Sequence, residues 1–573
     1  MQTQAPAITV DFDVPATMRD GTVLRANVYR PAGQGRWPVL LTRLPYGKDL
    51  PLGTTFLDPV QAARRGYAVV VQDTRGRSRS DGDWYPFAYE AEDGADTIAW
   101  AAGLPCSNGQ VGMYGASYFG FTQWSAATQR PPALRAAVPT LTWADPLNGL
   151  TYRGGAFELG LLAAWHMQQG IDILVRRHRD DPRLLGRAIA ELCREYDALG
   201  RDGYRSLPLG EFGPHRRQEV APAFFDEIAA PMDRERSAPL TILGRHERVQ
   251  IPTLNVGGWY DVFLADTIAN FGAMRAQGTP TRLLLGPWSQ TATRNPIGQL
   301  NFGFGAQLGF IDLQADFGTL QLRWFDHWLK GIDSGVAAEP PIRLFVMGAN
   351  VWRHEQEWPL ARAVDTPYYL RADGELSPEP PDAEAPDRYD YDPADPVPTL
   401  GGALLMTPEY PSGPLDQRAI ELRPDVLVFT TLPLERDAEV TGPVRVHLWA
   451  VSSAPDTDFV ARLLDVYPDG RSINLTDGVV RARYRGFRAG EPPSPIEPGR
   501  AYEYEIDLWA TSNVFRAGHR IGLHVTSSCF PRWDRNPNTG HAFGADAELR
   551  MAHQAILHDR GHPSRVVLPL VPG

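Results

Sequence analysis

The sequence has few cysteines, no long apolar run and no recognisable leader. Its three cysteines, Cys106, Cys193 and Cys529, stand alone, without a C-x-x-C pair. An odd number of isolated cysteines argues against a disulfide framework or a structural zinc site and is typical of a reducing compartment. No stretch approaches the roughly 18 apolar residues of a membrane span, and the N-terminal residues lack the basic and apolar regions of a signal peptide. These absences predict a soluble protein of the cytoplasm.

Basic residues are also scarce, and so are motifs that bind metals or cofactors. The 573 residues carry 56 Lys and Arg against 68 Asp and Glu, a net charge of −12, whereas nucleic-acid binding needs clustered basic residues. The stretch GFGAQLG at 303–309 lacks the last glycine of G-x-G-x-x-G, and there is no Walker loop, H-E-x-x-H or EF-hand loop. We therefore expect no cofactor, no metal, no nucleic-acid partner and no membrane partner.

The N-terminal part of the chain has the pattern of a parallel sheet with helices on both faces. Residues 39–44 and 67–72 are continuous apolar or β-branched runs, which is typical of strands buried on both faces. A helical segment is expected at 92–102. The alternation of strand and helix predicts an α/β fold with a doubly wound sheet. We assign this sheet to residues 1–144 and 242–355.

Two other patterns interrupt and follow the sheet. Residues 145–241 place apolar residues at three- and four-residue spacing among Arg and Glu, which predicts an inserted helical cap, an element that commonly covers an active site. Residues 371–398 are rich in Pro and acidic residues, which is typical of a loop or linker. Beyond them the apolar period becomes two, so we assign residues 356–573 to a C-terminal β-sandwich, a jelly roll.

A serine stands between a strand-like run and a helix-like run. Residues 112–120 read Gly-Met-Tyr-Gly-Ala-Ser-Tyr-Phe-Gly, and Gly115 and Gly120 leave room for a sharp turn around Ser117. Such a turn holds a serine in a strained conformation with its hydroxyl exposed, as the nucleophile of an α/β-hydrolase requires. A serine between glycines is by itself usually only a turn. The flanking strand and helix favour the catalytic interpretation.

A serine hydroxyl is a weak nucleophile, and it needs a base that an acid orients. In this fold the partners follow in the order Ser, Asp, His at the ends of strands. Asp261 follows the strand-like run IPTLNVGGWY, and the next such position, after RLLLGPWS, is Gln290. An Asp at a strand end is alone more often a helix cap, and the chain order selects Asp261. His246 and His327 do not follow a strand and are predicted to be structural or surface residues.

Acyl transfer also needs donors for the developing oxyanion. The backbone N–H of Tyr118, directly after Ser117, is the first candidate. Tyr46, in the loop after the strand at 39–44, is the second, because a phenol can donate where lipases use a backbone N–H; a core aromatic is the alternative. Trp165 in the cap and Phe263 beside the acid are candidates to line a substrate pocket, although core packing would explain both equally well.

The sequence resembles the cocaine esterases, within the group that includes X-Pro dipeptidyl peptidases, α-amino acid ester hydrolases and glutaryl cephalosporin acylases. The blocks that carry the resemblance run almost end to end: MRDGTVLRANVYRP, YAVVVQDTRGRSRSDG, VGMYGASYFG, GGWYDVF, GPWSQ, RLFVMGANVWRHE, YDPADPVPTLGG, TDFVARLLDVYPDG, ATSNVFRAGHRI and SSCFPRWDRNPNTG. The resemblance implies an α/β-hydrolase domain, a helical cap and a jelly roll. It also implies that Ser117 is the nucleophile, Asp261 the triad acid, and Tyr46 with the Tyr118 amide the oxyanion hole.

The third triad position departs from the family pattern. The family has Gly-Pro-Trp-Ser-His where this chain has Gly-Pro-Trp-Ser-Gln290, and the neutral amide of glutamine cannot take the Ser117 proton. An engineered replacement that traps substrate and a natural pseudoenzyme are both compatible with this change. The retention of Ser117, Asp261 and Tyr46 favours the first explanation.

The predicted function is that of a serine hydrolase which cleaves a carboxylic ester through an acyl-enzyme and is severely impaired as written. The expected partner is a small-molecule ester or amide substrate, and a homodimer is left open. The alternatives are an amidase, either a β-lactam acylase or an X-Pro peptidase, and an inactive binding protein with a hydrolase fold.

Overall fold

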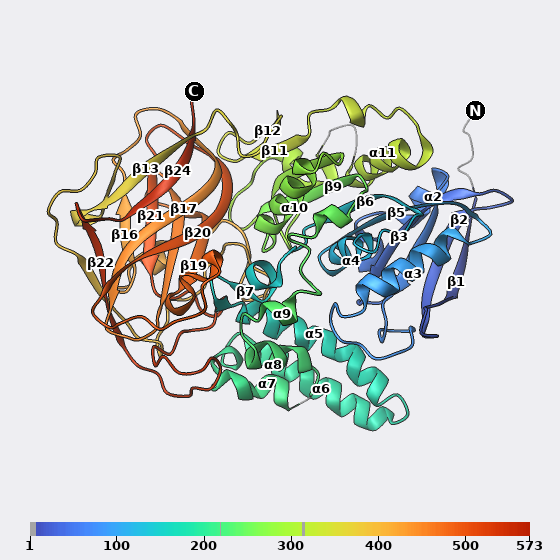
Figure 1. The fold of residues 1–573 in the computed structure, drawn as a ribbon, viewed down its shortest axis with the longest axis horizontal. Coiled ribbons are helices and arrows are strands. Elements are labelled where there is room, and N and C mark those ends of the chain that lie inside the picture. The colour runs from blue at the N-terminus through green and yellow to red at the C-terminus, as the bar shows by residue number, and fades with distance from the viewer. Residues whose placement is uncertain (1–6, 218, 312–315, 573) are drawn as a thin grey trace.

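The computed structural model describes residues 7–217, 219–311 and 316–572, and its N-terminal unit is built on a ten-stranded sheet (Figure 1). The strand order is β1-β2-β4-β3-β5-β6-β9-β10-β11-β12. Neighbours from β4 to β11 are parallel, and β1, β2 and β12 are antiparallel to their neighbours at the two edges. The strands are β1 (Ile8–Thr17), β2 (Val23–Pro31), β3 (Trp37–Leu44), β4 (Ala68–Asp73), β5 (Ser107–Ala116), β6 (Leu134–Thr140), β9 (Thr253–Tyr260), β10 (Thr281–Ser289), β11 (Ile342–Val346) and β12 (Val351–Glu355).

Helices pack on both faces of this sheet. On β3, Val39 and Leu41 belong to an apolar cluster with residues of α3 and α4, whereas Leu40 and Leu44 belong to a second cluster with residues of α11. Successive side chains of a strand point to opposite faces, so both faces of β3 are buried. The predicted α/β fold with a doubly wound sheet is confirmed. The helices of this unit are α1 (Leu52–Thr55), α2 (Pro59–Arg64), α3 (Glu90–Ala102), α4 (Tyr118–Ala127), α10 (Leu264–Ala276) and α11 (Phe317–Lys330).

A group of helices interrupts the sheet between β6 and β9 and lies at the bottom of Figure 1. It follows a short two-stranded hairpin, β7 (Tyr152–Arg153) and β8 (Ala156–Phe157). Neither α5 nor any other helix in the described part of the chain combines the length and apolar character that a membrane crossing requires. The helices of this cap are α5 (Leu159–Arg177), α6 (Pro182–Leu199), α7 (Gly213–Arg216), α8 (Pro222–Ala229) and α9 (Arg234–Ser237).

The C-terminal unit is rich in strands and lies at the left of Figure 1, beside the sheet and the cap. Its strands follow the order β15-β22-β17-β24-β13-β14-β16-β21-β18-β19, with β20 paired to β17 and β23 paired to β22. The only α-helix it contains among the described residues is α12 (Arg418–Glu421). The strands are β13 (Val364–Arg371), β14 (Glu375–Ser377), β15 (Asp387–Tyr391), β16 (Leu427–Thr430), β17 (Ala438–Ser452), β18 (Asp458–Val466), β19 (Ser472–Arg481), β20 (Ala501–Phe515), β21 (Arg520–Thr526), β22 (Ala552–Asp559), β23 (His562–Pro563) and β24 (Arg565–Val571).

The segment expected to be a linker, 371–398, contains two of these strands. In β15 the side chains of Tyr389 and Tyr391 are buried while Asp390 between them is exposed. The two tyrosines therefore give this short strand a buried face. The strand was not predicted because the surrounding prolines and acidic residues are typical of a loop or linker.

Buried ionic contacts tie the C-terminal unit to the segment that leads into α5. Arg532 donates from Nη1 to Asp477 Oδ1 at 2.7 Å, and Arg153 donates to the same Asp477 side chain. Trp533 donates from its indole to Glu158 Oε1 at 2.8 Å, directly before α5 begins. The start of the cap helix is thus fixed by the strand-rich unit.

Candidate active site

Ser117 occupies a strained turn between β5 and α4. Its backbone has φ 55° and ψ −125°, a conformation that costs an ordinary residue free energy and persists only where the surroundings enforce it. Gly115 has φ +134°, and a Cβ on Gly120 would lie 2.6 Å from the Cβ of Thr142. The Ser117 N–H is bonded to the carbonyls of Thr140 at 3.0 Å and Leu141 at 3.1 Å, at the end of β6. The predicted turn is therefore present and is anchored to the neighbouring strand.

Asp261 and Gln290 follow directly after two adjacent strands. In the pairing of β9 with β10, Tyr260 lies opposite Ser289, so Asp261 and Gln290 are the next residues on each strand. Asp261 is fully buried, and its carboxyl group has no side-chain hydrogen-bond partner among the described residues. Burial raises its pKa well above the usual range, and the nearby N–H groups of Val262 and Phe263 offset this only in part.

Gln290 has a buried amide oxygen, Oε1, that lacks a hydrogen-bond partner in the described part of the chain. A buried polar group without a partner costs free energy. The Asp261 carboxyl and the Gln290 carbonyl thus lie at the ends of neighbouring strands, and neither has a side-chain partner among the described residues. An imidazole with an N–H donor is a side chain that would satisfy the carboxylate.

Tyr46 lies two residues beyond β3, and its hydroxyl is in hydrogen-bonding contact with the Ser117 side chain. The indole of Trp165, in α5, donates to the same hydroxyl oxygen at 3.2 Å. Burial raises the pKa of the Tyr46 phenol, which therefore keeps its proton and can act as a donor at neutral pH. The structure thus brings Ser117, Tyr46 and Trp165 together from β5, the loop after β3 and the cap.

Tyr118 is held by a buried network that the sequence did not reveal. Its hydroxyl donates to Glu90 Oε1 at 2.8 Å and accepts from the backbone N–H of Phe87 at 2.9 Å. Arg43 in β3 donates to Glu90 Oε2 at 2.7 Å, and both charged side chains are buried. This network fixes the first residue of α4, whose N–H lies next to Ser117. The one sequence signal was a charged residue inside the apolar run of β3.

Arg77 is a second residue that the sequence did not single out. It is buried and donates from Nε to the carbonyl of Pro45 at 2.8 Å, next to Tyr46. Its other nitrogens donate to the carbonyl of Gln169 in α5 at 3.1 Å and to the Gln169 side chain at 3.0 Å. One guanidinium therefore connects the loop that carries Tyr46 to the cap helix that carries Trp165.

The two aromatic candidates lie in different surroundings. Trp165 is half-buried and stacks on Phe87, with ring centroids 5.7 Å apart and planes 10° apart. Phe263 is only 1% exposed and packs against Trp143 at 5.3 Å between centroids. Trp165 therefore belongs to the surroundings of the Tyr46 hydroxyl, whereas Phe263 is packed in the core behind Asp261. A pocket role for either stays a prediction.

The histidines expected to be structural make contacts of that kind. His246 is buried, and its Nε2 lies 2.8 Å from Asn270 Oδ1. His327 lies in α11 against the ring of Trp328, 4.7 Å away. His166, the neighbour of Trp165, is buried among aromatic rings, and burial lowers its pKa to about 3. In the described ranges, no group of three or more His, Cys, Asp or Glu side chains is arranged to hold a metal ion.

Comparison with known proteins gives a consistent family. The family model for X-Pro dipeptidyl-peptidases of the S15 family matches residues 20–291, and the model for the X-Pro dipeptidyl-peptidase C-terminal non-catalytic domain matches residues 334–567. The cocaine esterase of Rhodococcus sp. (strain MB1 Bresler) is 37% identical, covering 98% of this chain and 99% of that protein. This chain belongs to the cocaine esterase family.

Solved structures support the same relationship. An α-amino acid ester hydrolase has a TM-score of 0.81 at 26% identity and covers 100% of this chain and 98% of its own. An aminopeptidase from a marine sediment Thaumarchaeota archaeon has a TM-score of 0.81 at 26% identity, covering 99% and 97%. The resemblance stated from the sequence blocks is therefore confirmed. As a member of the cocaine esterase family, the chain is a serine hydrolase of the type that cleaves esters or peptides.

Proposed function

We propose that this protein is built to cleave carboxylic esters through an acyl-enzyme on Ser117. The observation that carries the proposal is the strained turn at Ser117 with the neutral phenol of Tyr46 in contact with its side chain. A strained, exposed serine beside preformed donors is the arrangement that acyl transfer needs. The preference for esters is supported by the cocaine esterase relative, which is similar over nearly the whole chain.

The proposed mechanism assigns one role to each side chain. A base at position 290, oriented by Asp261, takes the Ser117 proton as the hydroxyl attacks the ester carbonyl. The Tyr46 hydroxyl and the Tyr118 backbone N–H stabilise the oxyanion. The alcohol leaves with a proton from the base, and water then hydrolyses the acyl-enzyme by the same route in reverse.

We further propose that Gln290 makes this chain a severely impaired hydrolase. The glutamine amide does not accept a proton at neutral pH, so the Ser117 hydroxyl keeps its own. In subtilisin, loss of the serine or the histidine of the triad costs about 10⁶ in turnover and leaves roughly 10³–10⁴ over water. The Asp261 carboxyl supports this proposal, because it has no side-chain partner among the described residues and is the group that a triad histidine would contact.

The test is the hydrolysis of p-nitrophenyl butyrate by this chain, by Gln290→His and by Gln290→His with Ser117→Ala. We expect turnover to rise by about 10⁴-fold or more in the first variant and to be lost again in the second. An X-Pro p-nitroanilide, assayed in parallel, separates ester cleavage from peptidase action. If Gln290→His hydrolyses neither compound faster than the parent chain, the proposed function is wrong.

A further inference from the structure

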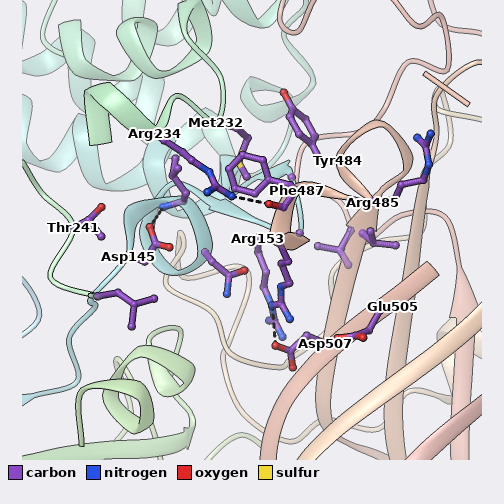
Figure 2. Close-up of a pocket in the computed structure, with 18 of the residues that line it drawn as sticks. Asp145, Arg153, Met232, Arg234, Thr241, Tyr484, Arg485, Phe487, Glu505 and Asp507 are labelled. Atoms are coloured by element: carbon purple, nitrogen blue, oxygen red, sulfur yellow. Dashed lines mark hydrogen bonds and ion pairs between the residues drawn. The ribbon is translucent and has the colours of Figure 1, made fainter. Parts of the chain in front are cut away.

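A cavity of about 560 Å³ lies between the cap, the loop after β6 and the C-terminal strands, away from the catalytic residues (Figure 2). None of Ser117, Asp261, Gln290 and Tyr46 lines it. Its size is that of a site for a small organic ligand. Three segments that are distant in the sequence form its walls, namely 145–155, 232–245 and 479–507.

The lining combines apolar side chains with an excess of positive charge. Leu147, Met232, Val479, Val480 and Phe487 contribute the apolar wall. Five arginines line the cavity, Arg153, Arg234, Arg245, Arg485 and Arg488, against the three carboxylates of Asp145, Glu505 and Asp507. A ligand that matches this lining has an apolar body and a negative charge.

Arg153 is the buried member of this set. It is 2% exposed, its guanidinium lies 3.6 Å from the centre of the Trp509 ring, and its Nε has no hydrogen-bond partner in the described part of the chain. Burial and the neighbouring Arg532 lower its pKa to about 10, so it is still a cation at neutral pH. An unpartnered donor on a buried cation favours an anionic ligand.

Arg153 shares its nearest carboxylate with two other arginines. Asp477 forms ion pairs with Arg153, Arg462 and Arg532, all of them buried. Glu158 and Asp507 also act on the charge of Arg153. A single carboxylate is thus divided among three guanidiniums, in a region where incompletely compensated charge is costly.

Arg234 faces the same cavity from α9, as Figure 2 shows. Its Nη2 donates to the backbone carbonyl of Phe487 at 2.6 Å, and its guanidinium lies 4.3 Å from the centre of the Phe487 ring. Among the described residues it forms no ion pair with a carboxylate, whereas Arg488 is paired with Asp507 at 2.8 Å. The Arg234 side chain therefore keeps donors free for an anion.

We propose that this cavity binds a hydrophobic carboxylate, with its anionic head neutralised by Arg153 and Arg234 and its apolar body against the aliphatic and aromatic wall. A carboxylate matches the fork of a guanidinium, which can donate two parallel hydrogen bonds. The site is separate from the proposed catalytic residues, and its occupancy does not depend on activity at Ser117.

The test is isothermal titration calorimetry with phenylbutyrate. Its primary amide, which lacks the negative charge, and acetate, which lacks the apolar body, are the controls. We expect saturable binding of phenylbutyrate only. Arg234→Gln should raise its Kd about tenfold, through loss of a charge-assisted hydrogen bond. Glu505→Gln, which removes a negative charge from the exposed rim, should lower the Kd about twofold. Arg248→Gln, an exposed arginine that does not line the cavity, should leave the Kd unchanged.

Trp165→Ala separates this cavity from the proposed catalytic site, because Trp165 contacts Tyr46 and does not line the cavity. We expect this variant to bind phenylbutyrate as the parent does. The proposal is overturned if no saturable heat appears, if the amide or acetate binds as tightly as phenylbutyrate, or if Arg234→Gln has no effect. It is also overturned if Trp165→Ala, rather than Arg234→Gln, weakens binding, since the acid would then lie beside Ser117.

Discussion

Replacing Asp261 by asparagine should stabilise the protein at neutral pH. Replacing a buried carboxylate whose hydrogen bonds are all formed would instead destabilise it. The Asp261 carboxyl is buried without a side-chain partner among the described residues, and burial holds its pKa well above the usual range although the N–H groups of Val262 and Phe263 lower it in part. In the unfolded chain the same carboxyl has a pKa of about 3.9. Between these two pKa values the folded protein keeps a proton that the unfolded chain has released.

The sign of the pH dependence follows from this difference. Because the native state binds more protons, the free energy of unfolding falls by about 1.4 kcal/mol per pH unit from about pH 4 up to the pKa of folded Asp261. The stability contributed by this group is present below the unfolded pKa and is lost as the pH rises. An asparagine does not titrate, so Asp261→Asn removes this loss. We expect the free energy of unfolding of the variant to exceed that of the parent chain by at least about 1.4 kcal/mol at pH 7, which corresponds to a pKa difference of one unit.

The assay is urea unfolding of both proteins from pH 4 to pH 8, with Asp180→Asn as a control at a carboxylate that is 96% exposed. The parent and the control should lose stability with rising pH relative to Asp261→Asn. In a Gln290→His background the effect should reverse, because an imidazole N–H gives the carboxylate a partner and lowers its pKa. Parallel curves for the parent and Asp261→Asn over this range would refute the reasoning.

Three further substitutions test the surroundings of Ser117. In a Gln290→His background, Tyr46→Phe should lower kcat by about 10²–10³ with little change in KM, because an oxyanion donor is lost; steady-state kinetics in which only KM rises would contradict this. Glu90→Gln leaves Arg43 as an unpaired buried charge and should cost about 3–5 kcal/mol of stability in chemical unfolding; a cost below about 1 kcal/mol would count against the network. Gly115→Ala, whose Cβ would overlap the ring of Phe119 at a φ of +134°, should fail to give folded protein or should lower Tm by several degrees in calorimetry; an unchanged Tm would show that the turn is not tight.

The sequence predicted the parts of the fold that depend on local pattern. The apolar run at 39–44 lies within β3 because both faces of the sheet are covered, and such strands leave a continuous apolar signature. The turn at Ser117 was also predictable from local pattern. Two glycines, with a strand-like run before them and a helix-like run after them, define it within nine residues. The strand β15 was missed because its two buried tyrosines stand among prolines and acidic residues.

The contacts that support the site could not be predicted, because they join residues that are far apart in the chain. Arg43 and Glu90 are separated by 47 positions, and Arg77 and Gln169 by 92. No apolar periodicity and no short sequence motif links such pairs, and only the folded sheet and cap bring them together. The cavity lined by Arg153 and Arg234 has the same origin, because its walls come from three separate segments.

The central claim is that Ser117 is a competent nucleophile whose base is missing at position 290. The most direct measurement is labelling with a fluorophosphonate probe, followed by mass spectrometry of the modified peptide, on this chain, on Gln290→His and on Gln290→His with Ser117→Ala. We expect slow labelling of this chain, fast labelling of Gln290→His on Ser117, and none when Ser117 is replaced. Equal labelling rates for this chain and Gln290→His, or a label on another residue, would contradict it.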